Sequence, residues 1–576
     1  MSDLETLRNI IKDHVIFKNT NGQLAMQTDP SAWTFNFREI LMNGKAADII
    51  ASIFYEQFHT EYPFQICAQE IAGVPLATSL MNKFYAQGHA DSNAVFIRKS
   101  RKKTGMTRMI EGSLEEHKKI ILVDDVINSG NTFWRQIEVL EYYGYTVDTV
   151  WAILRYQDES YYKRFYQRGI KVRSLFTLDE FADSLGDEAQ TRLKTVPESI
   201  AMPFSTLWGF RSEKPSLEWV VNKSQPVIDD SKIYFGSDNR TFWAINQADG
   251  SVAWKYQVGS VQRKKAIFSN PALYKNTVIF GSYDGNVYCL DKHTGAVKWI
   301  CFEADWVGSS PAVSQELGLV FIGLEFGLIN KRGGIIALDV ASGEPKWIDR
   351  THMAMTHCSP HYIAEHKQVV IGSNDGVVRL HDARTGYVLW KFTTFGAADF
   401  VPETGHIGYS NGDIKESFTY SQKHDYIIFG AIDGFLYILD RKTGHLVHHH
   451  KCEFGIFSTP YIYQDTVYFT AADKRVRAIN LDSLSLLFDV LVDGTRIFSS
   501  PTVINGRLYV GTNAARLHEL EPRTGTHLGY FQAVERITNT VVYNKTTDTY
   551  FLPTYANEII ALKRDGDSAL DTKEVK

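Results

Sequence analysis

The chain has 576 residues, 61 Lys and Arg against 66 Asp and Glu, and a formal net charge of −5. This length exceeds what one ordinary hydrophobic core supports, so it predicts several domains, or a repeat array together with a domain. The mildly negative charge gives no general attraction to nucleic acid or to an anionic membrane. No stretch approaches the roughly 20 apolar residues that span a bilayer.

Residues 1–20 lack a basic region followed by an apolar run, so we expect no secretory signal and a soluble, cytoplasmic protein. The cysteines form no CxxC pair, which argues against a disulfide framework and against a zinc ribbon. We therefore interpret all five as buried thiols: Cys67, Cys289, Cys301, Cys358 and Cys452.

Residues 1–190 alternate helical stretches with short apolar runs, such as those at 120–123 and 150–154. This pattern is typical of buried parallel strands joined by crossover helices. It predicts an α/β domain over residues 1–190, followed by a linker over 191–215.

The most informative segment follows the apolar run at 120–123. It continues with Asp124 and Asp125, then the small-residue loop 128–132, then a helical pattern. Backbone N–H groups at the start of such a helix can receive a phosphate dianion, and Gly130 lets the backbone approach it closely. The carboxylates would then face ribose hydroxyls. The alternative is a capped strand–helix junction, because Asp, Asn, Ser and Thr are favoured at turns and caps.

This segment resembles the diphosphoribosyl-phosphate (PRPP) motif of type I phosphoribosyltransferases, and among them the orotate phosphoribosyltransferases. Residues 69–77 resemble the pyrophosphate-binding turn of that family. The basic run 98–105 looks like its mobile active-site loop, and residues 169–178 are similar to its final strand. The resemblance covers about residues 10–190 and implies the α/β phosphoribosyltransferase fold with its parallel sheet.

The resemblance also implies roles for single residues. The catalytic residues would be Lys102, Asp124 and Asp125. The pyrophosphate loop would be Glu70, Ile71, Ala72 and Gly73. The PRPP-binding residues would be Arg98, Lys99, Asp124, Asp125, Asn128, Ser129, Gly130, Asn131 and Thr132.

The implied substrates are PRPP and a small nitrogenous base, with Mg²⁺ bound through PRPP and no metal ligand assigned to the protein itself. Arg155 lies near the position of an arginine that grips the orotate carboxylate, and we interpret it either as a base contact or as a structural residue. The family's active-site loop often reaches across a dimer interface, so a homodimer through this domain is also implied.

Two departures from the family leave an alternative open. Thr104 stands where the orotate enzymes carry a histidine, and Gln27–Asp29 replaces their Lys-Ser-Gly. The main prediction is a Mg²⁺-dependent phosphoribosyltransferase acting on an orotate-like base. The alternative is a sensor that binds PRPP or a nucleotide without turnover, or a regulatory scaffold.

From residue 216 onward, β-branched and aromatic runs alternate with Gly, Asp and Asn. The copy at 278–299 reads as three strands joined by tight turns, with a fourth strand before it that opens at Asn270-Pro271. Eight copies predict an all-β eight-bladed propeller over 216–564. The last copy lacks its tryptophan strand, so we expect residues 216–222 to complete it, and we expect 565–576 to be a flexible tail.

The blade endings Asp291–Trp299 and Asp382–Trp390 resemble the quinoprotein (PQQ) dehydrogenase-like propeller repeat. Because fold does not fix function, we expect a platform that binds a protein partner rather than a quinone. We interpret the recurring tryptophans as packing. A metal site at His448–His450 is disfavoured, because alternate side chains of a strand face opposite ways.

Overall fold

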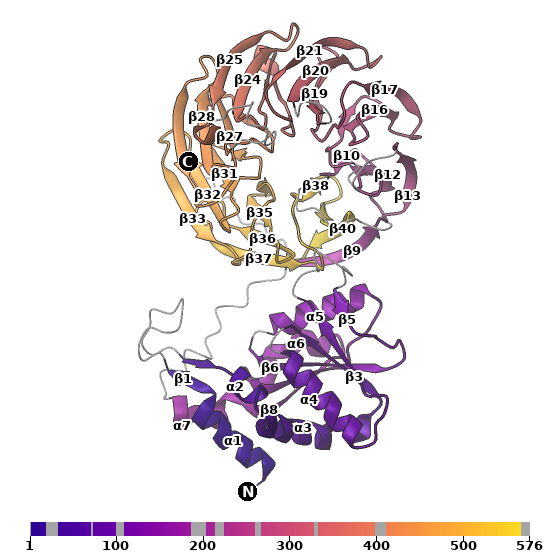
Figure 1. The fold of residues 1–576 in the computed structure, drawn as a ribbon, viewed down its shortest axis with the longest axis vertical. Helices are drawn as coiled ribbons and strands as arrows, with labels where there is room; N and C mark the ends of the chain where they lie inside the picture. The colour runs from indigo at the N-terminus through magenta and orange to yellow at the C-terminus, as the bar shows by residue number, and fades with distance from the viewer. Residues whose placement is uncertain are drawn as a thin grey trace. The chain divides into compact units, whose positions relative to one another are not determined.

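The structure, a computed structural model, describes residues 2–18, 33–70, 73–98, 109–128, 130–185, 203–212, 224–259, 267–327, 332–397 and 411–565. The chain divides into two compact units, residues 1–200 and 201–576. Each unit is described separately below, and both can be followed in Figure 1.

The first unit is built around a six-stranded sheet in the order β5-β4-β3-β6-β7-β8. All neighbours pair in parallel except β5, which is antiparallel to β4. A separate short hairpin joins β1 and β2. The strands are β1 (Ile16–Lys18), β2 (Trp33–Phe35), β3 (Phe64–Gln69), β4 (Ala94–Ile97), β5 (Ile110–Glu111), β6 (Lys119–Ile127), β7 (Thr149–Arg155) and β8 (Lys171–Thr177).

The helices of this unit bury apolar stripes against the sheet. Side chains of α1, α3 and α4 form one core cluster with β3, β6 and β7, in which Phe54 packs edge-on against Trp151 at 4.9 Å between ring centroids. The helices are α1 (Asp3–His14), α2 (Arg38–Leu41), α3 (Gly44–Phe58), α4 (Gly73–Ala86), α5 (Asn131–Tyr142), α6 (Lys163–Gln167) and α7 (Ala182–Leu185). None of these helices has the length and apolar composition that a membrane crossing requires. The predicted α/β domain is confirmed.

The second unit is an eight-bladed propeller, as predicted, and each blade is a four-stranded antiparallel sheet. Blades one to three are β10–β13 (Val227–Ile228, Lys232–Gly236, Thr241–Asn246, Val252–Gln257), β14–β17 (Ala272–Tyr274, Thr277–Gly281, Asn286–Asp291, Val297–Phe302) and β18–β21 (Ala312–Ser314, Leu319–Phe326, Arg332–Asp339, Pro345–His352). Blades four and five are β22–β25 (His361–Ile363, Gln368–Ile371, Val377–Asp382, Val388–Thr393) and β26–β29 (Thr419–Ser421, Tyr426–Gly430, Phe435–Asp440, Leu446–Lys451). Blades six and seven are β30–β33 (Tyr461–Tyr463, Thr466–Thr470, Arg475–Asn480, Leu486–Leu491) and β34–β37 (Thr502–Ile504, Arg507–Gly511, Arg516–Leu520, His527–Gln532).

The eighth blade closes the ring with a strand from the start of the propeller. Its first three strands are β38 (Val542–Asn544), β39 (Thr549–Thr554) and β40 (Glu558–Arg564), and its fourth is β9 (Phe204–Arg211). β9 pairs with β40 from Phe204 opposite Arg564 to Arg211 opposite Glu558. The prediction that residues 216–222 complete this blade is therefore wrong, and residues 213–223 lie outside the described ranges.

Trp208 gives β9 the tryptophan that marks the fourth strand of other blades. Trp208 pairs with Ala561, as Trp254 pairs with Ala244 in blade one. Its indole Nε1 donates to the Gln247 carbonyl at 3.1 Å, across the seam between blades eight and one. Both segments carry a tryptophan in an apolar run, so the local pattern cannot distinguish them.

The same tryptophan contact joins five of the eight blades to the next blade. In four further blades the indole donates to a carbonyl of the next blade at 2.7–3.0 Å, from Trp254, Trp299, Trp347 and Trp390. The turn glycine of the next blade lies against the indole face, where a Cβ would collide, as Gly295 does against Trp254. The tryptophans are packing residues, as predicted.

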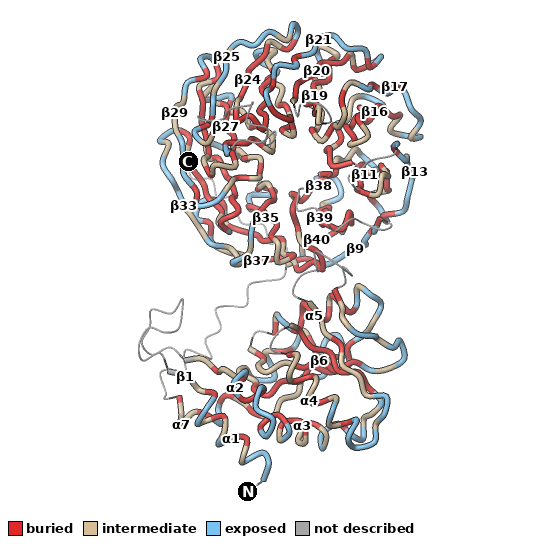
Figure 2. The backbone as a smooth tube through the Cα atoms, in the orientation of Figure 1, coloured by how far each residue is buried: buried red, intermediate tan, exposed pale blue. Residues whose placement is uncertain are grey.

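Burial follows strand position within each blade (Figure 2). The second and third strands are nearly continuous buried runs, such as Val278–Gly281, because they face neighbouring blades on both sides. Burial alternates along the fourth strands β13, β25 and β29, and in β29 His448 and His450 are half-buried while His449 is exposed, as the alternation predicts.

Candidate functional site

The acidic pair lies near the carboxyl end of β6. Asp124 and Asp125 are half-buried, and the backbone N–H of Asp125 donates to Asp124 Oδ1 at 3.0 Å. Gly130 follows with a left-handed φ of 73° and directly precedes α5. The predicted order of strand, acidic pair, loop and helix is therefore present, with Ser129 outside the described residues.

Side chains of the segment 157–164, which follows β7, form hydrogen bonds with the loop. This segment was not identified from the sequence. Tyr162 Oη lies 2.9 Å from the Asn128 carbonyl, and Gln157 Nε2 donates to Asn128 Oδ1 at 3.1 Å. Arg164 Nη2 donates to Asn131 Oδ1 at 2.9 Å. Burial raises the pKa of Tyr162 well above its ordinary value, so its hydroxyl remains a donor.

A second support acts on Gly130 itself. A Cβ on this residue would lie 2.8 Å from Phe165 Cε2, so the loop has space only for glycine. The ring of Phe165 packs edge-on against Trp134 of α5, with 5.5 Å between centroids. Phe165 therefore restricts this position of the loop to glycine.

The basic loop begins from a hairpin. The backbone N–H of Arg98 donates to the Met109 carbonyl at 2.9 Å, which joins the two ends of segment 99–108 between β4 and β5. Arg98 Nη1 lies 3.6 Å from Glu70 Oε2 and 3.5 Å from Glu111 Oε1. Lys99 and Lys102 lie outside the described residues. Of the predicted pyrophosphate contacts in this loop, Arg98 alone lies among the described residues. Its guanidinium is paired with two carboxylates.

Arg155 is the last residue of β7, and its Cα is the register partner of Ile127 at the end of β6. Its guanidinium is mostly buried and forms an ion pair with Glu159 at 3.5 Å. The neighbouring Tyr156 has a pKa raised first by burial and then by the Asp125 carboxylate. The Arg155 segment and the acidic pair are therefore neighbours on adjacent strands.

The parallel topology explains why distant sequence segments meet. The strands β3, β4, β6 and β7 end at one edge of the sheet, and Glu70, Arg98 and Arg155 each lie at or directly after such an end. Gly73 begins α4 behind β3, where a Cβ would lie 2.7 Å from Ala68 Cβ. Ile71 and Ala72 lie outside the described residues. In open α/β sheets, ligands bind at this carboxyl edge.

The fold and this edge define a protein of two classes in one chain: a phosphoribosyltransferase-like α/β unit, and a propeller of quinoprotein-like repeats. Residues 205–361 and 374–567 match the family model described as outer membrane protein assembly factor BamB. This match spans more than half of the chain, and the chain belongs to that family.

Two relatives each match one of the two units. Outer membrane protein assembly factor BamB of Shewanella oneidensis is 23% identical over 281 residues, 44% of this chain and 69% of the relative. Orotate phosphoribosyltransferase of a Bradyrhizobium species is 28% identical over 155 residues, 26% of this chain and 83% of the relative. The N-terminal region is therefore homologous to orotate phosphoribosyltransferases.

A solved structure agrees with the propeller fold. A quinohemoprotein alcohol dehydrogenase from Pseudomonas putida HK5 has a TM-score of 0.51 at 14% identity, covering 65% of this chain and 78% of that one. At this identity the likeness concerns the fold alone.

Proposed function

We propose that the N-terminal unit is a Mg²⁺-dependent phosphoribosyltransferase that joins PRPP to an orotate-like base, and that the propeller is a platform for a protein partner. The observation that carries the proposal is the preformed edge itself. The acidic pair lies on β6 and the glycine-opened helix N-terminus follows it, while Arg98 directly follows β4 and Arg155 ends β7 at the same edge of the sheet.

The reaction would break the C–O bond between ribose C1 and pyrophosphate and form a C–N bond to the base. The phosphate of PRPP would accept hydrogen bonds from the backbone at the start of α5, where the helix dipole favours an anion. Asp124 and Asp125 would accept hydrogen bonds from the ribose hydroxyls. Pyrophosphate would leave with both bonding electrons and would take up the proton that the base nitrogen loses.

Arg98 would act on the leaving group. Its present carboxylate partners, Glu70 and Glu111, lie at 3.5–3.6 Å, which is long for charge-assisted hydrogen bonds. A pyrophosphate oxygen at ordinary hydrogen-bond distance would compete well for the guanidinium. Lys99 and Lys102 would add positive charge, and such stabilisation is strongest in a closed site.

The residues present fit a magnesium ion that arrives with PRPP. Mg²⁺ prefers oxygen ligands and is usually held by one or two carboxylates together with substrate phosphates. Asp124, Asp125 and Glu70 are the described carboxylates that could contribute, and the ion would neutralise charge on the pyrophosphate.

The test is phosphorus NMR of PRPP with the full chain, Mg²⁺ and a mixture of orotate, purine and pyrimidine bases. We expect pyrophosphate release that depends on one base and is lost in Asp125→Asn. The matched control is Asp183→Asn, the same change at an exposed position of α7. Release that persists in Asp125→Asn would contradict the assignment.

A sensor is the second candidate, and Thr104 is the observation that favours it, because the orotate enzymes carry a histidine there. Intact PRPP in the NMR experiment, together with a thermal shift that requires Asp125, would support the sensor. The absence of both release and binding by the unaltered chain would contradict both candidates.

A further inference from the structure

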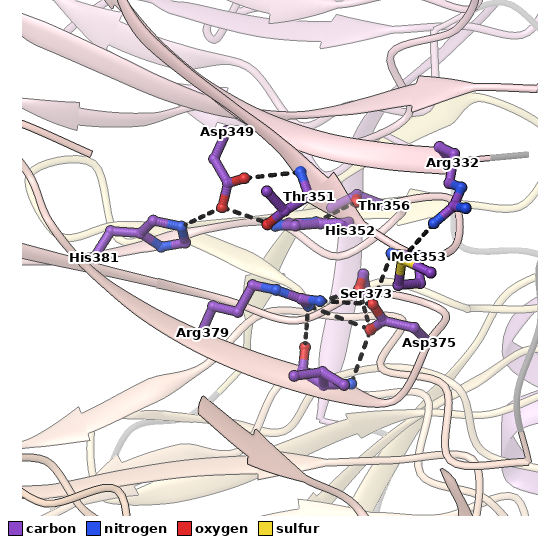
Figure 3. Close-up of polar contacts among 11 residues, drawn as sticks. Arg332, Asp349, Thr351, His352, Met353, Thr356, Ser373, Asp375, Arg379 and His381 are labelled. Carbon is purple, nitrogen blue, oxygen red and sulfur yellow. Dashed lines mark hydrogen bonds and ion pairs between the residues drawn. The ribbon is translucent and has the colours of Figure 1, made fainter. Parts of the chain in front are cut away.

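Two histidines and one aspartate form a buried cluster between blades three and four (Figure 3). Asp349 and His352 lie on β21, and His381 lies on β24. His381 Nε2 is 2.9 Å from Asp349 Oδ2, and His352 Nε2 is 3.9 Å from the same oxygen. All three donor atoms lie within 4.8 Å of one another, and both imidazoles are fully buried.

The propeller repeat offers an internal comparison for each residue. His381 follows the bulge in the third strand of its blade. The other seven described blades place a buried aliphatic residue there: Ile245, Leu290, Leu338, Leu439, Ile479, Leu520 and Leu562. Core packing of this position therefore does not require an imidazole.

Asp349 departs from the repeat in the same way. It lies two residues after the tryptophan position of the fourth strand, opposite Ile335. The equivalent residues of the other seven described blades carry no acid: Tyr256, Cys301, Phe392, His450, Val490, Phe531 and Phe210. Two departures from the repeat thus meet in space although they lie on different blades.

A bulge places Asp349 and His352 on one face. Residues three apart on a regular strand face opposite ways. Here Gly333 pairs with His352 and Ile335 pairs with Asp349, so β21 carries one extra residue. Such bulges re-aim side chains. Gly333 and Gly334 provide the space, because a Cβ on them would collide with Thr356 Oγ1 and with the Asp349 carbonyl.

His352 has a free nitrogen directed at this cluster. Its Nδ1 lies 2.8 Å from Thr356 Oγ1, whereas its buried Nε2 has no hydrogen-bond partner among the described residues. Burial, with the nearby Arg379 cation, lowers the pKa of His352 to about 3. With its proton on Nδ1, the neutral ring presents the Nε2 lone pair toward Asp349. Buried polar atoms without a partner are costly and require an explanation.

The surrounding charges leave the cluster open to a cation. Burial alone would raise the pKa of Asp349, but hydrogen bonds from His381 and Thr351 outweigh it and hold the pKa well below the usual range. The nearby Arg379 is engaged by Asp375, with 2.7 Å between Nη2 and Oδ2. A metal ion would replace the proton that His381 Nε2 shares with Asp349 Oδ2, so the donor set is one carboxylate and two imidazoles.

We propose that Asp349 Oδ2, His352 Nε2 and His381 Nε2 bind a Zn²⁺ ion that ties β21 of blade three to β24 of blade four. Imidazole with carboxylate suits zinc, whereas Ca²⁺ and Mg²⁺ prefer all-oxygen sites. Ligand atoms of tetrahedral zinc lie about 3.3 Å apart, as follows from its bond lengths of about 2.0–2.1 Å. The observed separations of 2.9 and 3.9 Å lie on either side of that value.

The surroundings of His352 fit the same ion. Metal-binding histidines commonly donate their other ring N–H to an oxygen, and Thr356 Oγ1 lies 2.8 Å from His352 Nδ1, in place to accept it. Trp347 stacks on His381 at 5.9 Å with an interplanar angle of 14° and shields that ligand from solvent. Water would supply the fourth ligand, and the deep burial indicates a structural ion rather than a substrate site.

The test is calorimetric titration of Zn²⁺ into the full chain after chelator treatment, with the visible absorption of bound Co²⁺ as a second readout. We expect one strong zinc site per chain. His381→Leu installs the aliphatic residue of the other blades and should abolish the site, as should His352→Gln. Thr356→Val removes only the hydroxyl that contacts His352 Nδ1 and should weaken zinc binding about 10- to 100-fold.

Two controls separate this site from other donors. His518→Gln alters another buried histidine–aspartate contact, in which both ring nitrogens have partners, and should retain zinc. Asp125→Asn should also retain it, which excludes the phosphoribosyltransferase edge. A chain that binds no zinc stoichiometrically would overturn the proposal. Unchanged zinc affinity in folded His352→Gln and Thr356→Val would also overturn it. These two variants provide the test if His381→Leu does not fold.

Discussion

Gly130 combines two constraints that are usually found apart. Its φ of 73° is left-handed, and the space where a Cβ would lie is filled by Phe165. Gly169 has nearly the same φ, 74°, with no atom near the Cβ position. Comparing substitutions at Gly130 and Gly169 therefore separates the cost of a left-handed backbone from the cost of a steric collision within one unit.

We predict that Gly169→Ala lowers the stability of the N-terminal unit by about 1–2 kcal/mol, the cost of a left-handed alanine. Gly130→Ala should cost more, because it adds the collision with Phe165, and it should also weaken PRPP binding. Thermal unfolding with and without PRPP and Mg²⁺ measures both effects. Equal losses in the two variants would show that Phe165 moves aside.

His527 gives the propeller an acid-sensitive position. Burial, with His518 and Arg516, lowers its pKa to about 4. The folded state therefore resists protonation, while the unfolded chain takes up the proton near pH 6.5. Stability is full above about pH 6.5 and is lost as the pH falls toward 4.

We predict that protonation of His527 lowers the free energy of unfolding of the propeller by about 2 kcal/mol between pH 6.5 and 4. This is less than the full pKa shift would give, because the ring is partly exposed and its charge is screened by solvent. His527→Gln should flatten that part of the stability profile. Denaturant unfolding of the propeller at a series of pH values is the measurement. An unchanged profile would assign the acid sensitivity to other groups.

At the scale of residues, sequence reasoning succeeded where the signal was contiguous. Asp124 to Thr132 forms one uninterrupted motif, so its arrangement was predictable. The contacts of Tyr162, Gln157 and Arg164 with the loop were not, because they arise from a segment about 30 residues away with no motif of its own. His381 was also missed, although comparing the third strands of all blades would have revealed it.

Among the elements, β9 is the one that sequence reasoning misplaced. Blade strands joined by short turns are predictable, because the turn residues and their partners are close in sequence. β9 pairs with β40 about 350 residues later, so no local pattern reports the pairing. Gln225 and Thr540 then join blade one to blade eight with two reciprocal hydrogen bonds, at 2.8 and 3.0 Å.

We predict that a fragment of residues 201–576 is a folded monomer, whereas a fragment of 213–576 aggregates. Without β9, the edge of β40 exposes unpaired backbone groups that can recruit other chains. Size-exclusion chromatography and circular dichroism distinguish these outcomes. A well-behaved 213–576 fragment would show that β9 is not needed to protect the edge of β40.

At the scale of the whole molecule, the chain unites two units with separate cores and separate candidate ligands. A ligand that binds only the folded form of one unit stabilises that unit by mass action, by about 2.7 kcal/mol at one hundred times its dissociation constant. Scanning calorimetry of the full chain can therefore report on each unit in the same experiment.

PRPP with Mg²⁺ should raise the melting temperature of the transition that is absent from fragment 201–576, and leave the other unchanged. Zn²⁺ should do the reverse. The physical reason is that each ligand contacts residues of one unit alone. If PRPP raised both transitions, the two units would unfold cooperatively, and the propeller would respond to ligand binding at the N-terminal unit.

The closing strand also sets an order of events during translation. β9 leaves the ribosome before the other propeller strands, and its partner β40 follows about 350 residues later. At about 5–20 residues per second, β9 waits roughly 20–70 s for that partner. The ring is thus sealed only after the strands of all eight blades have been made, and a chain terminated before β40 leaves β9 without its partner.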